Sequence, residues 1–189
     1  MGDAQARQRQ AKWLRIFRKI HRVTGVGLCL FLLAVGLTGL LLGWKKNSGD
    51  WLLPTTRQGT STDLAAWLPL DSLHTRACAA ARDTFGAEFP LDLERIDVRP
   101  DKGMVKFVFE ADYAGLQLDG ATGRVLLVEK RRSDFVENLH DGSFFDKYFH
   151  TPHGIIKLIY TTIMGLALVV FTITGCWLWY GPKWMKRSR

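Results

Sequence analysis

The sequence predicts an α+β membrane protein in which two transmembrane helices flank one small domain. The first observation is a pair of long apolar runs without a charged residue, Val23–Trp44 and Leu158–Tyr180. At about 1.5 Å per residue, about 22 residues cover the roughly 30 Å hydrocarbon core of a bilayer. The second observation is the polar stretch between the runs, where short alternating apolar segments are separated by turn residues.

The placement of charge predicts how the two spans are oriented. The residues before the first span are strongly basic with one acid, Asp3, and the residues after the second span are basic with none. Because lysine and arginine are enriched on the cytoplasmic side, both termini are expected in the cytoplasm. The domain between the spans is then periplasmic, in a bacterial inner membrane. The net charge of +8 is a topology signal. The expected partner of these charges is the lipid bilayer, and no nucleic acid is expected.

These patterns divide the chain into segments. The cytoplasmic segments are 1–22 and 181–189, the transmembrane helices are 23–44 and 154–180, and the periplasmic part consists of a linker at 45–62, a domain at 63–130 and a membrane-proximal segment at 131–153.

The domain at 63–130 is expected to hold one helix and about four antiparallel strands. Apolar residues with helical spacing run from Leu70 to Phe85, after Asp63 or Asp71 as a cap. Alternating apolar residues then predict strands at 93–98, 104–110, 114–118 and 124–128. A module of about 65 residues buries only a modest core, so it is expected to lean on the membrane, the spans or a partner.

Several short elements of this sequence resemble the PepSY-associated transmembrane family. In the domain, the PepSY pattern of a helix and strands ending in a "D-x-x-T-G-x-V" turn is matched by Ala79-Ala80-Ala81, Ile96–Pro100 and Asp119–Val125. In the flanks, the family elements are matched by His21-Arg22-Val23-Thr24-Gly25, Leu139-His140 and Thr174-Gly175-Cys176-Trp177-Leu178-Trp179.

The resemblance implies a link to iron. Larger members of the family, with four or more spans, include inner-membrane proteins of iron uptake, and some resemble haem-containing reductases that release iron from siderophores. This chain has only two spans. A four-helix bundle, if one is required, would need two copies of the chain or a partner subunit.

The first candidate site is His21, at the start of the first span. On a helix of 100° per residue it lies at the edge of a stripe that includes Gly25, Gly36, Gly39 and Gly43. Such a stripe lets a helix or a flat macrocycle approach the backbone closely. Together with the resemblance, this makes His21 an expected axial ligand of haem b, with Gly25 and Gly36 beside it. The alternative is an interfacial histidine on a helix whose glycines serve only packing.

The other candidates are His140, His150 and His153, at the outer end of the second span. His150 and His153 would share a face if the helix has already begun, and Pro152 places His153 on its first turn, in line with Tyr160. They are expected to ligate a second haem or a metal ion, with His153 favoured by depth and His140 by its family position. The alternative is a polar interfacial loop. His74, on the domain helix, is expected to be structural.

No second histidine lies at the depth of His21, so a bis-histidine haem there would need a two-fold related copy or a partner subunit. The favoured function is therefore a b-type haem-linked electron-transfer subunit associated with iron or siderophore reduction. It would be a homodimer or part of a larger complex, with ferric siderophore as the outer acceptor. The alternative is a non-catalytic PepSY scaffold that binds a periplasmic partner or a larger membrane complex. Regulation of a peptidase has least support, and no residue pattern of a hydrolase is present.

Overall fold

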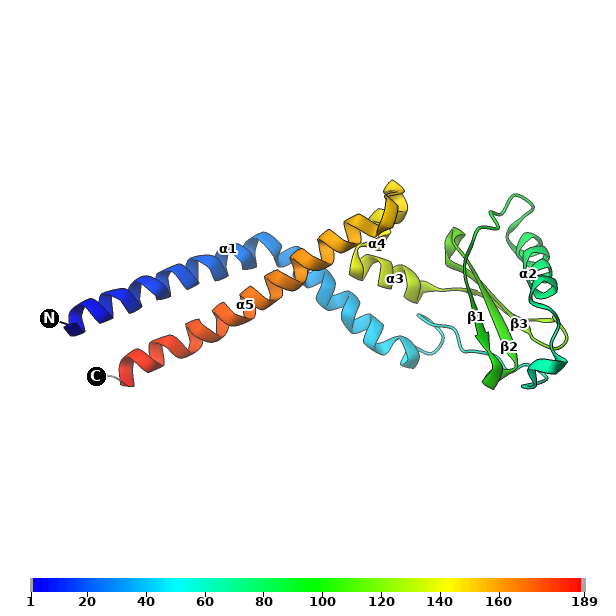
Figure 1. The fold of residues 1–189 in the computed structure, drawn as a ribbon, viewed down its shortest axis with the longest axis horizontal. Helices are drawn as coiled ribbons and strands as arrows, with labels where there is room; N and C mark the ends of the chain where they lie inside the picture. The colour runs from blue at the N-terminus through cyan, green and yellow to red at the C-terminus, as the bar shows by residue number, and fades with distance from the viewer. Residues whose placement is uncertain (1, 188–189) are drawn as a thin grey trace. The chain divides into compact units, whose positions relative to one another are not determined.

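The computed structural model describes residues 2–187 and separates into two units (Figure 1). We call Met1–Leu40 with Asn138–Arg189 the helical unit, and Leu41–Glu137 the sheet unit. The chain enters the sheet unit from the end of the first long helix and returns to the helical unit before the second one.

The helical unit is built on two long apolar helices, α1 (Gly2–Trp44) and α5 (Ile155–Arg187). Both are long and apolar enough to cross a membrane, over Gln8–Asn47 and Pro152–Lys183, and most of their apolar side chains face outward. They run antiparallel, because Phe17 packs on Trp177 and Phe31 packs on Tyr160. Helix α1 includes the basic segment expected at 1–22, since residues 3–22 contain neither glycine nor proline and many strong helix formers.

Two short helices, α3 (Arg132–Asp141) and α4 (Ser143–Phe149), precede α5. Gly142, with φ +83°, separates them because a left-handed residue interrupts a helix. Asp146 of α4 then caps α5 from a distance: its carboxylate accepts the N–H groups of Ile156 and Lys157, at 3.0 and 2.7 Å. This cap satisfies two of the donors that a helix start leaves without an intrahelical partner.

The expected position of His153 on the first turn of the second long α-helix is wrong. Pro152 begins only a short 3₁₀ turn, Pro152–Gly154, and α5 starts after it at Ile155. His150 and His153 both have left-handed backbones, with φ of +51° and +59°. They therefore do not share a helical face, and His153 is not in line with Tyr160 on α5.

The sheet unit contains the helix and the four strands that the sequence predicts. The strands β1 (Leu93–Arg99), β2 (Met104–Phe109), β3 (Ala114–Asp119) and β4 (Val125–Lys130) form an antiparallel meander in the order β1-β2-β3-β4. Helix α2 (Leu70–Phe85) packs on one face through Leu73, Ala77 and Ala81. Opposite them lie buried apolar side chains of β2 and β3: Val105, Phe107, Phe109, Leu116 and Leu118.

The other face of the sheet is covered by the segment expected to be a linker. The Arg57 N–H donates to Gln117 Oε1 at 2.8 Å, and Gln117 Nε2 donates to the Thr55 carbonyl at 3.3 Å. Buried charges on this face are paired, with Lys106 Nζ 2.8 Å from Glu129 Oε1. Burying a charge is costly unless it is paired, so this polar face depends on its internal contacts. Residues 45–62 thus belong to the sheet unit.

The "D-x-x-T-G-x-V" turn has a structural role. The Asp119 side chain is fully buried and accepts four hydrogen bonds, from the Ala121 and Thr122 N–H groups and from the N–H and hydroxyl of Thr60. Gly123 has φ +69°, which favours glycine at that position. Asp119 therefore joins the β3–β4 turn to the segment that covers the sheet.

Replacing this carboxylate should destabilise the sheet unit. In Asp119→Ala we expect a loss of about 3 kcal/mol, roughly a hundredfold in amide protection, because buried donors lose their acceptor. Hydrogen exchange of the full chain in detergent, followed by mass spectrometry of the β3–β4 peptides, measures it. Asp101→Ala is the matched control, since Asp101 is an exposed turn carboxylate. Equal protection in the two variants would contradict the assigned role.

The same carboxylate makes a pH prediction. Burial raises the pKa of Asp119, but the hydrogen bonds from Thr122, Thr60 and Ala121 lower it by more. Its pKa therefore lies below the ordinary value. The stabilisation is then fully present above the unfolded-state pKa of about 3.9 and is lost as the pH falls through the folded-state pKa. The difference in protection between Asp119→Ala and the wild type should shrink below about pH 4. A difference that stays constant down to pH 2 would show that the charge of Asp119 is not involved.

Candidate functional site

His21 packs against the far end of α5. Its Nδ1 lies 2.9 Å from Thr174 Oγ1, and its ring stacks on Phe171 with centroids 3.9 Å apart and planes 22° apart. A Cβ added to Gly175 would lie 3.4 Å from His21 Cε1, so the absence of a side chain there lets the imidazole reach the helix backbone. Thr174 is only 3% exposed, whereas His21 is half-buried.

His140, on α3, makes the same contact with α1. Its Nδ1 lies 2.9 Å from Thr38 Oγ1, and a Cβ added to Gly39 would lie 3.4 Å from its Cε1. Thr38 is 6% exposed. Each histidine thus meets a Thr-Gly pair on a different helix from its own, through the same ring atoms and at the same two distances.

The two contacts lie at opposite ends of the spans. Thr38 follows His21 by 17 residues on the continuous helix α1, which corresponds to about 26 Å along its axis. His140 sits on Thr38, so the two imidazoles are separated by most of the thickness of a hydrocarbon core. One metal ion or one haem iron cannot be shared between them.

The glycine stripe expected on the first span has two different uses. A Cβ on Gly25 would lie 2.8 Å from Phe171 Cε2, so Gly25 admits the aromatic ring that stacks on His21. Gly39 admits His140. Gly36 and Gly43 have open space around their Cα atoms within the described part of the chain. Half of the stripe is therefore used inside the chain, and half remains open to a neighbour.

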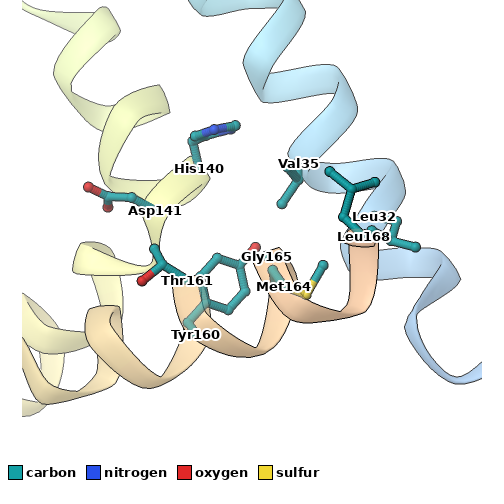
Figure 2. A pocket seen from close by; sticks show the side chains of 9 residues that line it. All are labelled: Leu32, Val35, His140, Asp141, Tyr160, Thr161, Met164, Gly165 and Leu168. Carbon is teal, nitrogen blue, oxygen red and sulfur yellow. The ribbon is translucent and has the colours of Figure 1, made fainter. Parts of the chain in front are cut away.

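A cavity of about 200 Å³ lies beside His140, between α1, α3 and α5 (Figure 2). Its polar lining comes from His140, Asp141, Tyr160 and Thr161. The remaining wall is apolar or backbone, formed by Leu32, Val35, Met164, Gly165 and Leu168. The cavity is smaller than the roughly 300–1,000 Å³ of typical small-molecule pockets.

Asp141, at one side of this cavity, forms an ion pair with Lys157 of α5. Burial raises the pKa of the Asp141 carboxyl, but hydrogen bonds from Lys157 and Ser143 lower it by more. Its pKa therefore lies below the usual range. Asp141 is therefore a carboxylate at neutral pH. Its pairing ties α3 to the start of α5, which helps to hold His140 in place.

The remaining histidines are placed differently. His150 and His153 are exposed, and among residues 2–187 no group of three or more metal-ligating side chains is gathered in one place. His140, His150 and His153 therefore do not form a three-residue metal group among the described residues. Their individual roles as ligands stay predictions. His74 lies on α2 with its Nε2 3.3 Å from Cys78 Sγ and its ring against Phe107, as part of the sheet unit's packing.

Two apolar helices of membrane-spanning length, with an α+β unit inserted between them in the chain, are the architecture of a candidate two-span membrane protein. The chain belongs to the PepSY-associated transmembrane family, because the model of the "PepSY-associated TM region" matches residues 18–189. No curated protein and no solved structure matches the chain. Two of the elements that carried the resemblance meet in the helical unit, through His21 and Thr174, whereas His140 meets Thr38, which lies outside these elements.

Thr38 was not among the residues predicted from the sequence, and Thr174 was part of a family element without an expected partner. A signal was available, since Leu37-Thr38-Gly39 in the first span is echoed by Ile173-Thr174-Gly175 in the second. A repeated polar residue beside glycine in two otherwise apolar helices indicates a shared contact, because a hydroxyl inside a span needs a hydrogen-bond partner.

Substitution of Gly25 should loosen the packing of α1 on α5. We expect Gly25→Ala to destabilise the detergent-purified protein by about 1–3 kcal/mol, because the added methyl overlaps the Phe171 ring. Gly27→Ala is the matched control. Gly27 has open space around it and should show no loss, or a small gain from helix propensity. The measurement is thermal unfolding followed by circular dichroism.

A second variant separates the clash from other effects. Gly25→Ala combined with Phe171→Leu should recover part of the lost stability, because the smaller side chain makes room for the methyl. Equal melting temperatures for Gly25→Ala and Gly27→Ala would contradict the close approach at Gly25.

Proposed function

We propose that the protein is a b-type haem-linked electron-transfer subunit of a bacterial inner membrane, associated with the reduction of iron or of a ferric siderophore. The observation that carries this proposal is the pair of half-buried His–Thr contacts at opposite ends of the long helices. In this proposal both termini are cytoplasmic and the sheet unit is periplasmic, following the positive-inside rule. His21 then serves the cytoplasmic end and His140 the periplasmic end.

The donor chemistry of the two sites fits haem iron. Neutral imidazole is an axial ligand of haem, which supplies reversible one-electron transfer when bound. Within the described residues both imidazoles make their hydrogen-bond contact through Nδ1. A ligand anchored at one ring nitrogen can offer the other one to a metal.

The surroundings of the two histidines favour a partner subunit. The cavity beside His140 is small, and the other histidines of the chain lie far from His21 in the sequence, on the domain helix or before the second long helix. A second copy of the chain, or a partner subunit, would supply both the missing wall and the second axial ligand. The open positions at Gly36 and Gly43 allow another helix to approach α1 closely. We therefore propose a homodimer or a subunit of a larger membrane complex.

Haem content tests this function directly. The detergent-purified protein, expressed with haem supplied, should show a reduced α-band near roughly 560 nm after addition of dithionite. His21→Ala and His140→Ala should each lose about half of the haem, because each removes the ligand at one end of the spans. The readout is the haem-to-protein ratio from the absorption spectrum.

Three further variants complete the series. His74→Ala, in the sheet unit, should keep the full haem content. His150→Ala and His153→Ala show whether either exposed histidine contributes to the outer site, and full haem in both would leave His140 as the outer ligand. A haem-free wild type would contradict the redox function. It would favour the alternative of a membrane-anchored scaffold, for which a co-purifying periplasmic or membrane partner would be sought.

A further inference from the structure

The threonine hydroxyls at the two histidine contacts each have a second partner. Thr174 Oγ1 lies 2.7 Å from the Val170 carbonyl, and Thr38 Oγ1 lies 2.6 Å from the Ala34 carbonyl. These are the carbonyls one helical turn earlier, which threonine in a helix commonly uses as acceptors. A hydroxyl has only one hydrogen, and a carbonyl can only accept. The hydrogen therefore lies on the carbonyl side, and the oxygen faces the histidine with a lone pair.

An oxygen lone pair at 2.9 Å from Nδ1 needs a proton on that nitrogen. We propose that Thr174 and Thr38 are positioning residues that hold His21 and His140 in the tautomer with the proton on Nδ1. In the neutral ring this leaves the Nε2 lone pair free to bind a ligand. The identity of that ligand as haem iron rests on the function proposed above, whereas the tautomer does not.

The surroundings of the two rings agree with this assignment. Of the ring atoms of His21, only Cε1 and Nδ1 come within 4 Å of the Cβ position on Gly175, and the same two atoms of His140 approach Gly39. Nε2 therefore lies farther from these glycines in both cases. Within the described residues, neither Nε2 has a hydrogen-bond partner. The ring edge that carries Nδ1 faces the Thr-Gly pair, and Nε2 is left for another molecule.

The duplication of the arrangement strengthens the inference. His21 comes from α1 and its threonine from α5, whereas His140 comes from α3 and its threonine from α1. Two independent pairs thus reach the same atoms, the same distance and the same back-bonded hydroxyl. Two contacts that served packing alone would not need to orient their imidazoles in the same way. The shared orientation matches what a ligand on Nε2 requires.

Histidine tautomers can be measured without any bound cofactor. The full-length protein, labelled with ¹⁵N at its five histidines and purified free of haem in detergent, would be studied by long-range ¹H–¹⁵N correlation. The pH would be about 9, where an ordinary imidazole is neutral. His21→Gln and His140→Gln assign the two signal sets. Both rings are expected to show a protonated Nδ1 and an unprotonated Nε2, and a proton on Nε2 of either ring would overturn the proposal for that site.

Threonine variants then show whether the hydroxyl is responsible. Thr174→Val should release His21 into a mixture of tautomers and leave His140 unchanged, and Thr38→Val should do the reverse. Thr174→Ser keeps the hydroxyl and should keep the tautomer. Thr172→Val is the matched control, because Thr172 donates to the Leu168 carbonyl in the same helix without meeting a histidine. A His21 signal that does not change in Thr174→Val would overturn the role of Thr174.

Haem titration of the same variants separates this inference from the proposed function. If the wild type binds haem, Thr174→Val and Thr38→Val should weaken binding by about 10- to 100-fold, as for other partners of metal-ligating histidines. Thr172→Val should bind as the wild type does. A protein that binds no haem but shows both expected tautomers would refute the function and support the positioning role. Unchanged haem affinity in both valine variants would overturn the role of the threonines in holding a ligand.

Discussion

The helical unit depends on one interaction made twice, the hydrogen bond from an imidazole to a threonine hydroxyl of a neighbouring long apolar helix. In a span of mostly aliphatic side chains, packing alone has many equivalent solutions, because lipid tails are as apolar as leucine. A buried polar pair has few solutions. The His21–Thr174 pair therefore sets which faces of α1 and α5 meet, and the His140–Thr38 pair fixes α3 on α1. The small residues Gly25, Gly39 and Gly175 allow the approach that these contacts need.

The sheet unit also depends on buried polar contacts, on one face of its sheet. Its α2 face is a conventional apolar core around Phe107, but its opposite face buries charged and polar groups under the segment that follows α1. Lys106, Glu129 and Gln117 satisfy one another there, and Asp119 ties the covering segment to the β3–β4 turn. A small domain thus gains a second layer without a second helix.

The spans, the α2 helix and the four-strand meander followed from the sequence, because each depends on local periodicity and on turn residues such as Pro100 and Gly123. His21 and His140 were candidates because each lies near the end of a span and in an element that resembles the family. The buried polar face of the sheet was not predicted. When only apolar residues are counted as buried, strands β2 and β3 are expected to bury one face and expose the other. The left-handed backbone of His153 and the partner of Thr38 were missed because they depend on a local conformation and on a contact between distant segments.

The way in which each histidine contact is divided between distant segments has a consequence for how the protein is made. Thr174 lies 153 residues after His21, and His140 lies 102 residues after Thr38. During synthesis the partners of the His140–Thr38 contact are both present once α3 has been made, whereas His21 must wait for the last part of α5. A chain whose translation stopped before α5 would therefore hold both residues of the first contact and lack Thr174 for the second.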